Sequence, residues 1–556
     1  MKTVKRKLEH DFNELMKDED TFPRFIELSR AFIHKYDEMV IWASIDFQRD
    51  TSNQQYEDWL KEVQRDIKPL LAVCKKRLYD ICLEKHGEAI ETTRMQTILM
   101  YQQTSFSEKN ILIRQQEDEQ INRYIQLIGS LQSMDEEAVL IHDLTALLFE
   151  SDEDVRETAY RAIHLSYQHH AESLQSIFSE LIRLRHEKAK NLELEHYVAY
   201  AFMELGRIDY TSKECLQLAL AVQKHIVPLK EVFQEEQTRF LGKQQLRPWD
   251  VRISPYSDVQ ETASTSVESL LETVGTILSN LDPSFHKVLE ELKSQKHLDL
   301  EGRAHKAGGG FCEFLPESET SFLFMNRTQT FDDVVILIHE LGHAVHHDLM
   351  KDAPDNFQQI PMEVAEFAAM TFELLSMEFW HLAIEDAAHV RKAKLEQFRL
   401  VIEFLPQTII VDQFQEWLYR NPAHTVEERN ERFASLRDRF DFNAIDWSTL
   451  SRWKGEEWLS IIHLFETPFY YIEYAMAQIA ALQMYRKYKE QPQQTIEAFK
   501  TALRATRTHS VKEVYALAGV SFDVSEHEME ALVCFVQEEV ERLQRTQNHL
   551  FLGVNA

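Results

Sequence analysis

Apolar positions recur along most of the chain with the period of an amphipathic helix. Between Pro69 and Pro228 there is no proline, and the sequence predicts successive helices rich in Glu, Gln, Arg, Leu and Ile. Apolar residues from Val267 to Leu281 follow helical spacing, and the following Asp-Pro at residues 282–283 is typical of a cap and the first residue of the next helix. No repeat of fixed period occurs, which disfavours a solenoid. The pattern predicts a mainly α protein.

One stretch departs from the helical pattern. Three consecutive glycines at residues 308–310 precede an aromatic-rich run at residues 311–316, and a second such run follows at residues 321–326. Two short aromatic runs around a proline-containing turn predict a β-hairpin. The hairpin could be a structural flap or part of a functional site, and the pattern favours neither. From about Asp332 the helical pattern returns and continues to the C-terminus.

Length and charge narrow the class of protein. The 556 residues exceed the usual domain size of about 100–200 residues, and 13 Gly and 13 Pro are few enough to predict long helices. The formal net charge of −31 opposes binding to nucleic-acid phosphates and to anionic lipids. No signal-peptide pattern and no membrane-spanning apolar segment is found, and the 5 cysteines form no CxxC pair. We expect a cytoplasmic protein that binds neither nucleic acid nor membranes.

The strongest chemical signal is the sequence HELGH at residues 339–343, within a strongly apolar helical segment. Positions i and i+4 share one face of a helix, so neutral His339 and His343 can bind one zinc ion, with Glu340 placed to activate a water molecule. One of the aspartates at residues 332–333 is expected to cap this helix. The alternative is an ordinary helix with core histidines, which would bury two His and one Glu at a cost.

A catalytic zinc site needs a third protein ligand. The metzincin continuation would require Gly at position 346 and His at position 349, but the chain has His346 and Leu349, which excludes it. A carboxylate from the next helix is the remaining common solution, and Glu363, Glu366 and Glu373 share one face at spacings of three and seven residues. The other interpretation of these glutamates is a solvated acidic stripe. His346 is the weaker candidate, since a carboxylate from a second helix closes the site with less strain.

A cluster of aromatic and polar residues occurs at residues 463–474, with the sequence HLFETPFYYIEY. Tyr471 and Tyr474 are three residues apart on a helix that Thr467 and Pro468 are expected to cap. Their hydroxyls could donate to an oxyanion, although a tyrosine cluster is more often core packing.

The chain resembles the oligoendopeptidase F and thimet oligopeptidase family of metallopeptidases in the segments HELGHAVHH, MEVAEFAAMTFELL and HLFETPFYYIEYA. KAGGGFC, SFLFMN and LGRIDYTSKECLQLALAVQKHIVPL resemble further parts of it, so the similarity runs from about Leu205 to Met484. We therefore expect an N-terminal helical region at residues 1–204 and a catalytic helical region at residues 205–556. The resemblance implies a clam-like helical body with a deep channel that admits short, unfolded peptides.

The resemblance also implies the metal ligands. Glu366 and Glu373 reproduce the family's pair of glutamates seven residues apart, which implies that one zinc ion is bound by His339, His343 and Glu366. Zinc is expected ahead of manganese or cobalt from the ligand types and the order of affinities.

Roles in catalysis and substrate binding follow from the same resemblance. Tyr474 matches a family tyrosine that donates to the oxyanion, whereas His463 and Tyr471 match less closely because the length of this loop varies. The SFLFMN strand resembles the edge to which family substrates add as an extra strand. The expected substrate-binding residues are Gly309, Gly310, Phe322 and Phe324.

These features together predict a zinc-dependent oligoendopeptidase that hydrolyses internal bonds of short peptides. Glu340 would take a proton from water and later pass it to the leaving amine. One alternative is a carboxypeptidase or dipeptidyl carboxypeptidase on a similar helical body, which would need a cationic group for the substrate's C-terminal carboxylate. Another is a non-enzymatic peptide-binding protein. The sequence does not determine the oligomeric state.

Overall fold

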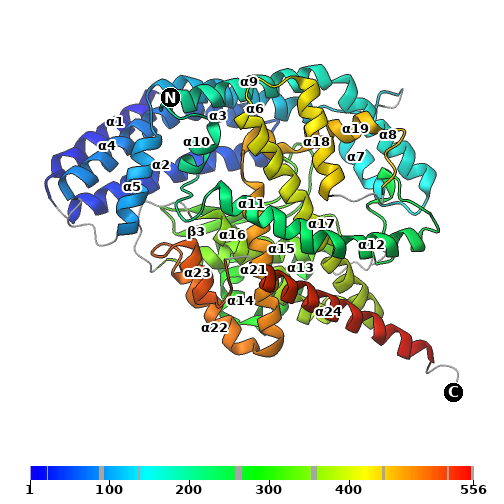
Figure 1. Ribbon diagram of the computed structural model, residues 1–556. Helices are drawn as coiled ribbons and strands as arrows, with labels where there is room; N and C mark the ends of the chain where they lie inside the picture. Colours follow the sequence, from blue (N-terminus) through cyan, green and yellow to red (C-terminus); the bar gives the residue numbers. More distant parts are fainter. Residues whose placement is uncertain are drawn as a thin grey trace.

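A computed structural model describes most of the chain. The described residues are 2–21, 23–86, 93–135, 138–256, 266–351, 360–440, 445–522 and 525–552. Helices dominate these residues and only a small three-stranded sheet is present among them, which confirms the predicted mainly α fold. Figure 1 shows the N-terminal helices above a body that contains α15, α16 and α21, with α24 extending away toward the C-terminus.

The helices before residue 205 contribute to several separate apolar clusters. They are α1 (Lys2–Leu15), α2 (Arg24–Arg49), α3 (Gln54–Glu62), α4 (Lys68–His86), α5 (Thr93–Ser105), α6 (Lys109–Gly129), α7 (Ile141–Ala146), α8 (Glu153–His169), α9 (Ala171–Lys190) and α10 (Tyr197–Glu204). Buried side chains between Leu8 and Leu99 form a cluster of their own. Buried residues of α6, α9 and α10 join a larger cluster that includes the HELGH helix, whereas those of α7 and α8 belong to smaller clusters. The division at residues 204/205 stays a prediction.

The later helices build the body around the HELGH segment. They are α11 (Ser212–Ala221), α12 (Val227–Phe240), α13 (Val267–Leu281), α14 (Pro283–Gln295), α15 (Asp332–Leu349), α16 (Met362–Ser376), α17 (Ala387–Arg420), α18 (Val426–Phe440), α19 (Ser451–Glu456), α20 (Ile462–Glu466), α21 (Tyr471–Glu490), α22 (Pro492–Arg504), α23 (Val511–Ala518) and α24 (Glu526–Leu552). The predicted cap is confirmed, because the Asp282 carboxylate accepts from the Ser284 N–H at 2.8 Å.

The sheet consists of β1 (Leu298–Asp299), β2 (Phe311–Leu315) and β3 (Thr320–Phe324). β2 and β3 form the predicted hairpin, while β1 is too short to leave a periodic signal in the sequence. β3 is the central strand, since it pairs parallel with β1 and antiparallel with β2. The SFLFMN strand therefore has no free edge for a peptide, and that prediction is wrong. The free edge belongs to β2.

The aromatic side chains of β3 are part of the core. Phe322 and Phe324 are 2% and 0% exposed and pack in a cluster with Ile45 of α2. This burial leaves neither ring a surface on which a peptide side chain could rest, and contact of these two residues with substrate stays a prediction.

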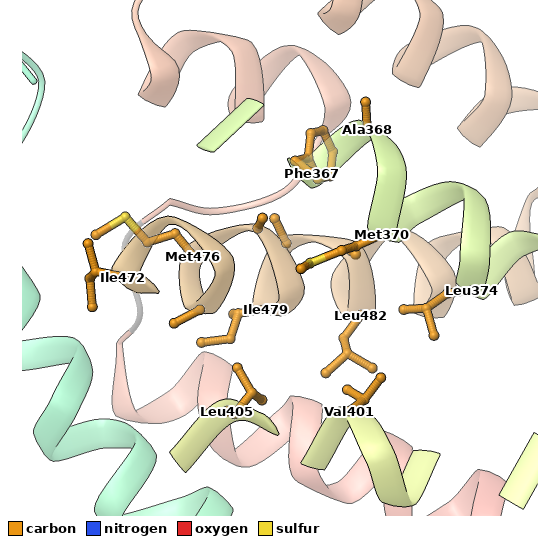
Figure 2. Packing of buried hydrophobic residues seen from close by; sticks show 14 of the residues in the cluster. Phe367, Ala368, Met370, Leu374, Val401, Leu405, Ile472, Met476, Ile479 and Leu482 are labelled. Atoms are coloured by element: carbon orange, nitrogen blue, oxygen red, sulfur yellow. The ribbon is translucent and has the colours of Figure 1, made fainter. Parts of the chain in front are cut away.

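Helix α21 packs between α16 and α17. Figure 2 shows Met370 and Leu374 of α16 on one side of it, and Val401 and Leu405 of α17 on the other. Full burial of each such side chain contributes roughly 1.5–3 kcal/mol. The packing fixes the first turn of α21, which carries the tyrosines, beside the acidic residues of α16.

Candidate metal centre and active site

The side chains of His339 and His343 on α15 and of Glu366 on α16 come together. One potential ligand atom from each lies within 4.8 Å of the others, and His339 Nε2 is 3.7 Å from Glu366 Oε2. Three atoms that each lie about 2.1 Å from one zinc ion are at most about 4.2 Å apart. The cluster is therefore close to the spacing that a zinc ion requires.

A close contact between helices produces this cluster. A Cβ atom on Gly342 would lie only 2.7 Å from the Cα of Ala369, so no larger residue fits where α15 meets α16. The glycine lets the two backbones touch and brings Glu366 opposite the two histidines. In the sequence, nothing but its place between the motif residues marks Gly342 as a packing residue.

The carboxylate of Glu366 is the clearest sign that a cation fits here. Its Oε1 accepts a hydrogen bond from the Tyr470 hydroxyl at 2.7 Å. Its Oε2 is buried and has no hydrogen-bond partner within the described ranges. A buried carboxylate oxygen without a partner is costly, and a metal ion would satisfy it.

Hydrogen bonds orient both imidazoles. His339 Nδ1 donates to Glu373 Oε1 at 2.6 Å, and Glu373 Oε2 accepts from Gln397 Nε2 at 2.9 Å. The His343 ring hydrogen-bonds the backbone carbonyl of Ala365. Metal-binding histidines commonly use one ring nitrogen in this way, which leaves the other for the ion. The donor set therefore fits zinc.

The charges around the cluster also favour a cation. Burial alone would lower the pKa of His339, but the hydrogen bond and charge of Glu373 raise it to about 10. Burial holds the pKa of His343 well below its usual range. Burial, together with the charges of neighbouring glutamates, raises the pKa of Glu340 to about 7. A pKa near neutrality suits a residue that must both accept and release a proton.

The three glutamates of α16 occupy three different environments. Glu366 faces the histidines and Glu373 orients one of them. Glu363 instead accepts a hydrogen bond from the Tyr210 hydroxyl and lies 4.0 Å from the Arg207 guanidinium. Of the candidates that the spacing left open, only Glu366 has a carboxylate in the histidine cluster. The prediction of a solvated acidic stripe is wrong for Glu363 and Glu366, which are 3% and 4% exposed.

The aspartates at the start of α15 do not cap it. The residue before the helix is Phe331, which makes no side-chain capping bond. Asp333 lies in the first turn and accepts from the N–H groups of Thr328 at 2.8 Å and Gln329 at 2.7 Å. The predicted cap is wrong because the helix already begins at Asp332, and Asp333 holds the preceding loop instead.

The predicted cap of α21 is also wrong. This helix begins at Tyr471, and Thr467 and Pro468 lie in the turn before it. Between them and the helix, Phe469 has a φ of 69°, in the left-handed region that breaks a helix. The chain therefore changes direction just before the tyrosines.

The turn at Phe469 is held by buried polar residues from distant parts of the chain. Its N–H donates to Gln415 Oε1 at 2.6 Å, and its carbonyl accepts from Arg207, which also pairs with Glu473 at 2.7 Å. Left-handed backbone in a bulky residue is strained and persists only when its surroundings fix it. These contacts place the Tyr470 hydroxyl on the histidine-glutamate cluster, and no local sequence signal points to them.

A cavity of about 830 Å³ opens over the cluster. Its walls come from α2, α4 and α5 on one side and from β2, α15, α16 and α21 on the other. Gly310 lines it, and a Cβ there would lie 3.4 Å from Glu340 Oε1, so the backbone at the start of β2 runs beside Glu340. Gly309 is not among the lining residues; its φ of 86° supports the turn, and its carbonyl accepts from Asn326.

The tyrosine segment meets the cavity at two residues. Tyr470 and Tyr474 line it, whereas Tyr471 and His463 pack behind, with ring centroids 5.7 and 6.0 Å from that of Tyr474. Of the three residues predicted here, the structure thus brings Tyr474 to the cavity wall. Tyr470, which the sequence alone did not single out, makes the direct contact with Glu366.

Comparisons with known proteins agree with this fold. An oligoendopeptidase F homolog of Lactococcus lactis subsp. lactis (strain IL1403) is 22% identical over 428 residues, which cover 75% of this chain and 69% of the relative. Group B oligopeptidase PepB of Streptococcus agalactiae serotype III (strain NEM316) is 22% identical over 437 residues, covering 76% and 68%. The solved structure of PZ peptidase A with an inhibitor shares the fold, with a TM-score of 0.88 at 21% identity over 97% of both chains.

A family model also matches the chain. The model of Peptidase family M3 matches residues 146–533, which is more than half of the chain and includes α15, α16 and the start of α21. The chain therefore belongs to peptidase family M3 and is a peptidase.

Proposed function

We propose that this peptidase is a zinc-dependent oligoendopeptidase, which hydrolyses internal bonds of short peptides. The observation that carries the proposal is the cluster of His339, His343 and Glu366, in which the buried Oε2 of Glu366 has no hydrogen-bond partner among the described residues. These three residues would hold the ion. Glu340 lies beside them on the same cavity wall.

The zinc ion and the side chains of the protein would have different roles in the reaction. A zinc ion would supply Lewis acidity, which polarises the peptide carbonyl and makes water more acidic. Glu340 accepts the proton of the attacking water on its carboxylate and delivers it to the nitrogen of the leaving amine. Tyr474 donates a hydrogen bond to the oxygen that gains negative charge. Glu373 and Tyr470 hold His339 and Glu366 in place.

The shape of the cavity supports short peptides as substrates. The site lies in a cavity with walls from the N-terminal helices and from the body. We expect this recess to admit an extended peptide and to exclude a folded domain. The free edge of β2 lines this space and offers backbone groups to an extended chain. The relatives named as oligopeptidases point to the same size of substrate.

Peptides with blocked ends test this function. With zinc bound, the protein is expected to cleave N-acetylated, C-amidated peptides of about ten residues at internal bonds, because backbone pairing along β2 needs no free terminus. Mass spectrometry of the products locates the bonds, and a stable folded domain should remain intact. Cleavage only of peptides with a free C-terminus would favour the carboxypeptidase alternative. Binding of peptides without hydrolysis by the zinc-loaded protein would favour the non-enzymatic alternative.

Replacing Tyr474 with phenylalanine is expected to lower kcat and kcat/KM together by about 10² to 10³, because one oxyanion donor is lost. KM and zinc content should stay close to those of the wild type. Steady-state kinetics and metal analysis measure these quantities. Tyr471→Phe is the matched control, since Tyr471 is not among the residues that line the cavity. Tyr470 is unsuitable as a control because its hydroxyl contacts Glu366. Unchanged kcat in Tyr474→Phe would remove Tyr474 from the mechanism.

The surroundings of the cysteines support a reducing compartment, and we propose the cytoplasm. All five cysteines are free, and only Cys534 is exposed. None of the helices in the described ranges combines the length and apolar composition needed to cross a bilayer.

A further inference from the structure

Glu313 stands in the middle of β2, the strand with the free edge. Its cross-strand partner is Phe322, and directly opposed residues project from the same face of a sheet. Phe322 packs toward Ile45 of α2, so Glu313 also projects toward the α2 side. Its neighbour Phe314 projects the opposite way, with its ring 4.9 Å from that of His347 on α15.

The described residues offer no partner to the carboxylate of Glu313. Across the described parts of the chain, no hydrogen bond or ion pair involves it, although the side chain lines the cavity and is exposed there. The cavity walls nevertheless desolvate the carboxyl in part, and this desolvation raises its pKa. A negative group in this state gains most from a positive ligand.

Three Lys or Arg side chains line the cavity, and each of them already contacts another part of the protein. Lys75, on the wall formed by the N-terminal helices, is paired with Asp37 at 2.7 Å. Arg207 is paired with Glu473 at 2.7 Å. Acidic residues outnumber Lys and Arg among the residues that line the cavity. Arg507, the third of these side chains, lies over the ring of Phe314, which projects from the other face of β2. Glu313 is therefore open to a cation from the substrate.

We propose that Glu313 forms a subsite for a Lys or Arg side chain of a peptide that pairs with the free edge of β2. The inference rests on the proposed function, because it assumes that the cavity receives a peptide as an added strand. A residue directly opposite Glu313 on such a strand would have its Cβ about 4.5–5.5 Å away on the same face. A lysine or arginine stem spans the remaining gap to the carboxylate.

The position of this subsite relative to the cleaved bond follows from the strand. Gly310 lies beside Glu340, where the bond would be cleaved, and Glu313 is three residues further along. At roughly 3.3 Å per residue, the two positions are about 10 Å apart. The preferred cation therefore lies about three residues from the cleaved bond, on one side of it only.

A lysine scan of blocked peptides tests the subsite. A single lysine is moved along an otherwise neutral peptide, and kcat/KM is measured for each position. At one position about three residues from the cleaved bond, lysine should raise kcat/KM about tenfold over alanine, equivalent to about 1.4 kcal/mol. Glu313→Gln should abolish this preference, and Glu313→Lys should reverse it in favour of a peptide with glutamate there.

Glu317 supplies the matched control. It is an exposed residue of the turn between β2 and β3 and is not one of the cavity-lining residues. Glu317→Gln and Glu317→Lys should keep the wild-type preference. The preference should also weaken with added salt, as expected for an ion pair. A lysine preference that survives in both Glu313 variants, or no preference at any position, would overturn the inference.

Measurements of peptide binding to inactive variants test the subsite independently of the proposed function. The same fluorescently labelled peptides are titrated into Glu340→Gln protein, which should bind without cleaving, and into the Glu313→Gln, Glu340→Gln double variant. Tighter binding of the lysine peptide by the single variant only would support the subsite even if the wild type hydrolysed nothing. Equal binding by both variants would overturn the subsite even if the wild type were an active oligoendopeptidase.

Discussion

Replacing Glu340 with glutamine is expected to lower kcat for a cleaved peptide by about two to four orders of magnitude, because the residue that accepts and returns the proton is lost. The amide has nearly the same shape as the carboxylate, so it can keep its place beside the backbone of Gly310. Zinc should remain bound, because His339, His343 and Glu366 are unchanged. Steady-state kinetics and zinc analysis of the same preparation measure both effects.

The midpoint temperature of thermal unfolding shows whether the loss of kcat in Glu340→Gln comes from the chemical step and not from a less stable fold. Burial raises the pKa of Glu340 to about 7, so its ionised carboxylate is poorly stabilised where it lies. A neutral amide avoids this cost, and the free energy of unfolding of the metal-free variant should match or exceed that of the metal-free wild type. Turnover close to the wild-type rate, with zinc bound, would refute the assignment of Glu340 as the base.

Replacing Glu366 with glutamine is expected to weaken zinc binding by more than about 10²-fold, because it exchanges a charged ligand for a neutral amide. The wild-type Oε2 atom is buried without a partner, so the ion is the contact that the substitution removes. Zinc affinity is measured by competition with a chelator of known affinity. Activity should fall with zinc content and recover in part when zinc is added in excess.

Two other glutamates of α16 provide graded controls. Glu373→Gln should cost about 10- to 100-fold in zinc affinity, as is typical when a group that orients a ligand is changed. Glu363→Gln should leave zinc affinity within a few-fold of the wild type and should change stability instead, because Glu363 lies against Tyr210 and Arg207. Equal losses of zinc in Glu366→Gln and Glu363→Gln would show that Glu366 is not the ligand.

Local features of the sequence determined most of the helices, the β-hairpin and the placement of the two histidines. Scarce glycine and proline and the helical period of apolar residues predicted the helices, including the bounds of α13 and the Asp282 cap, because these depend on neighbouring residues. The spacing of HELGH likewise fixed His339 and His343 on one face, since a helix alone decides that geometry. The hairpin at β2 and β3 was also readable from its turn.

Only the tertiary structure decided how these elements use their polar groups. The spacing of the three glutamates of α16 places them on one helical face. In the folded protein, each has a different partner: Glu373 contacts His339, Glu366 contacts Tyr470, and Glu363 lies near Arg207. Tyr470 reaches Glu366 through a strained turn that distant residues hold. The free edge belongs to β2 and not, as predicted, to β3, because β1, a two-residue strand, pairs with the other side of β3. Such contacts join residues far apart in the chain, and no local pattern encodes which of them will meet.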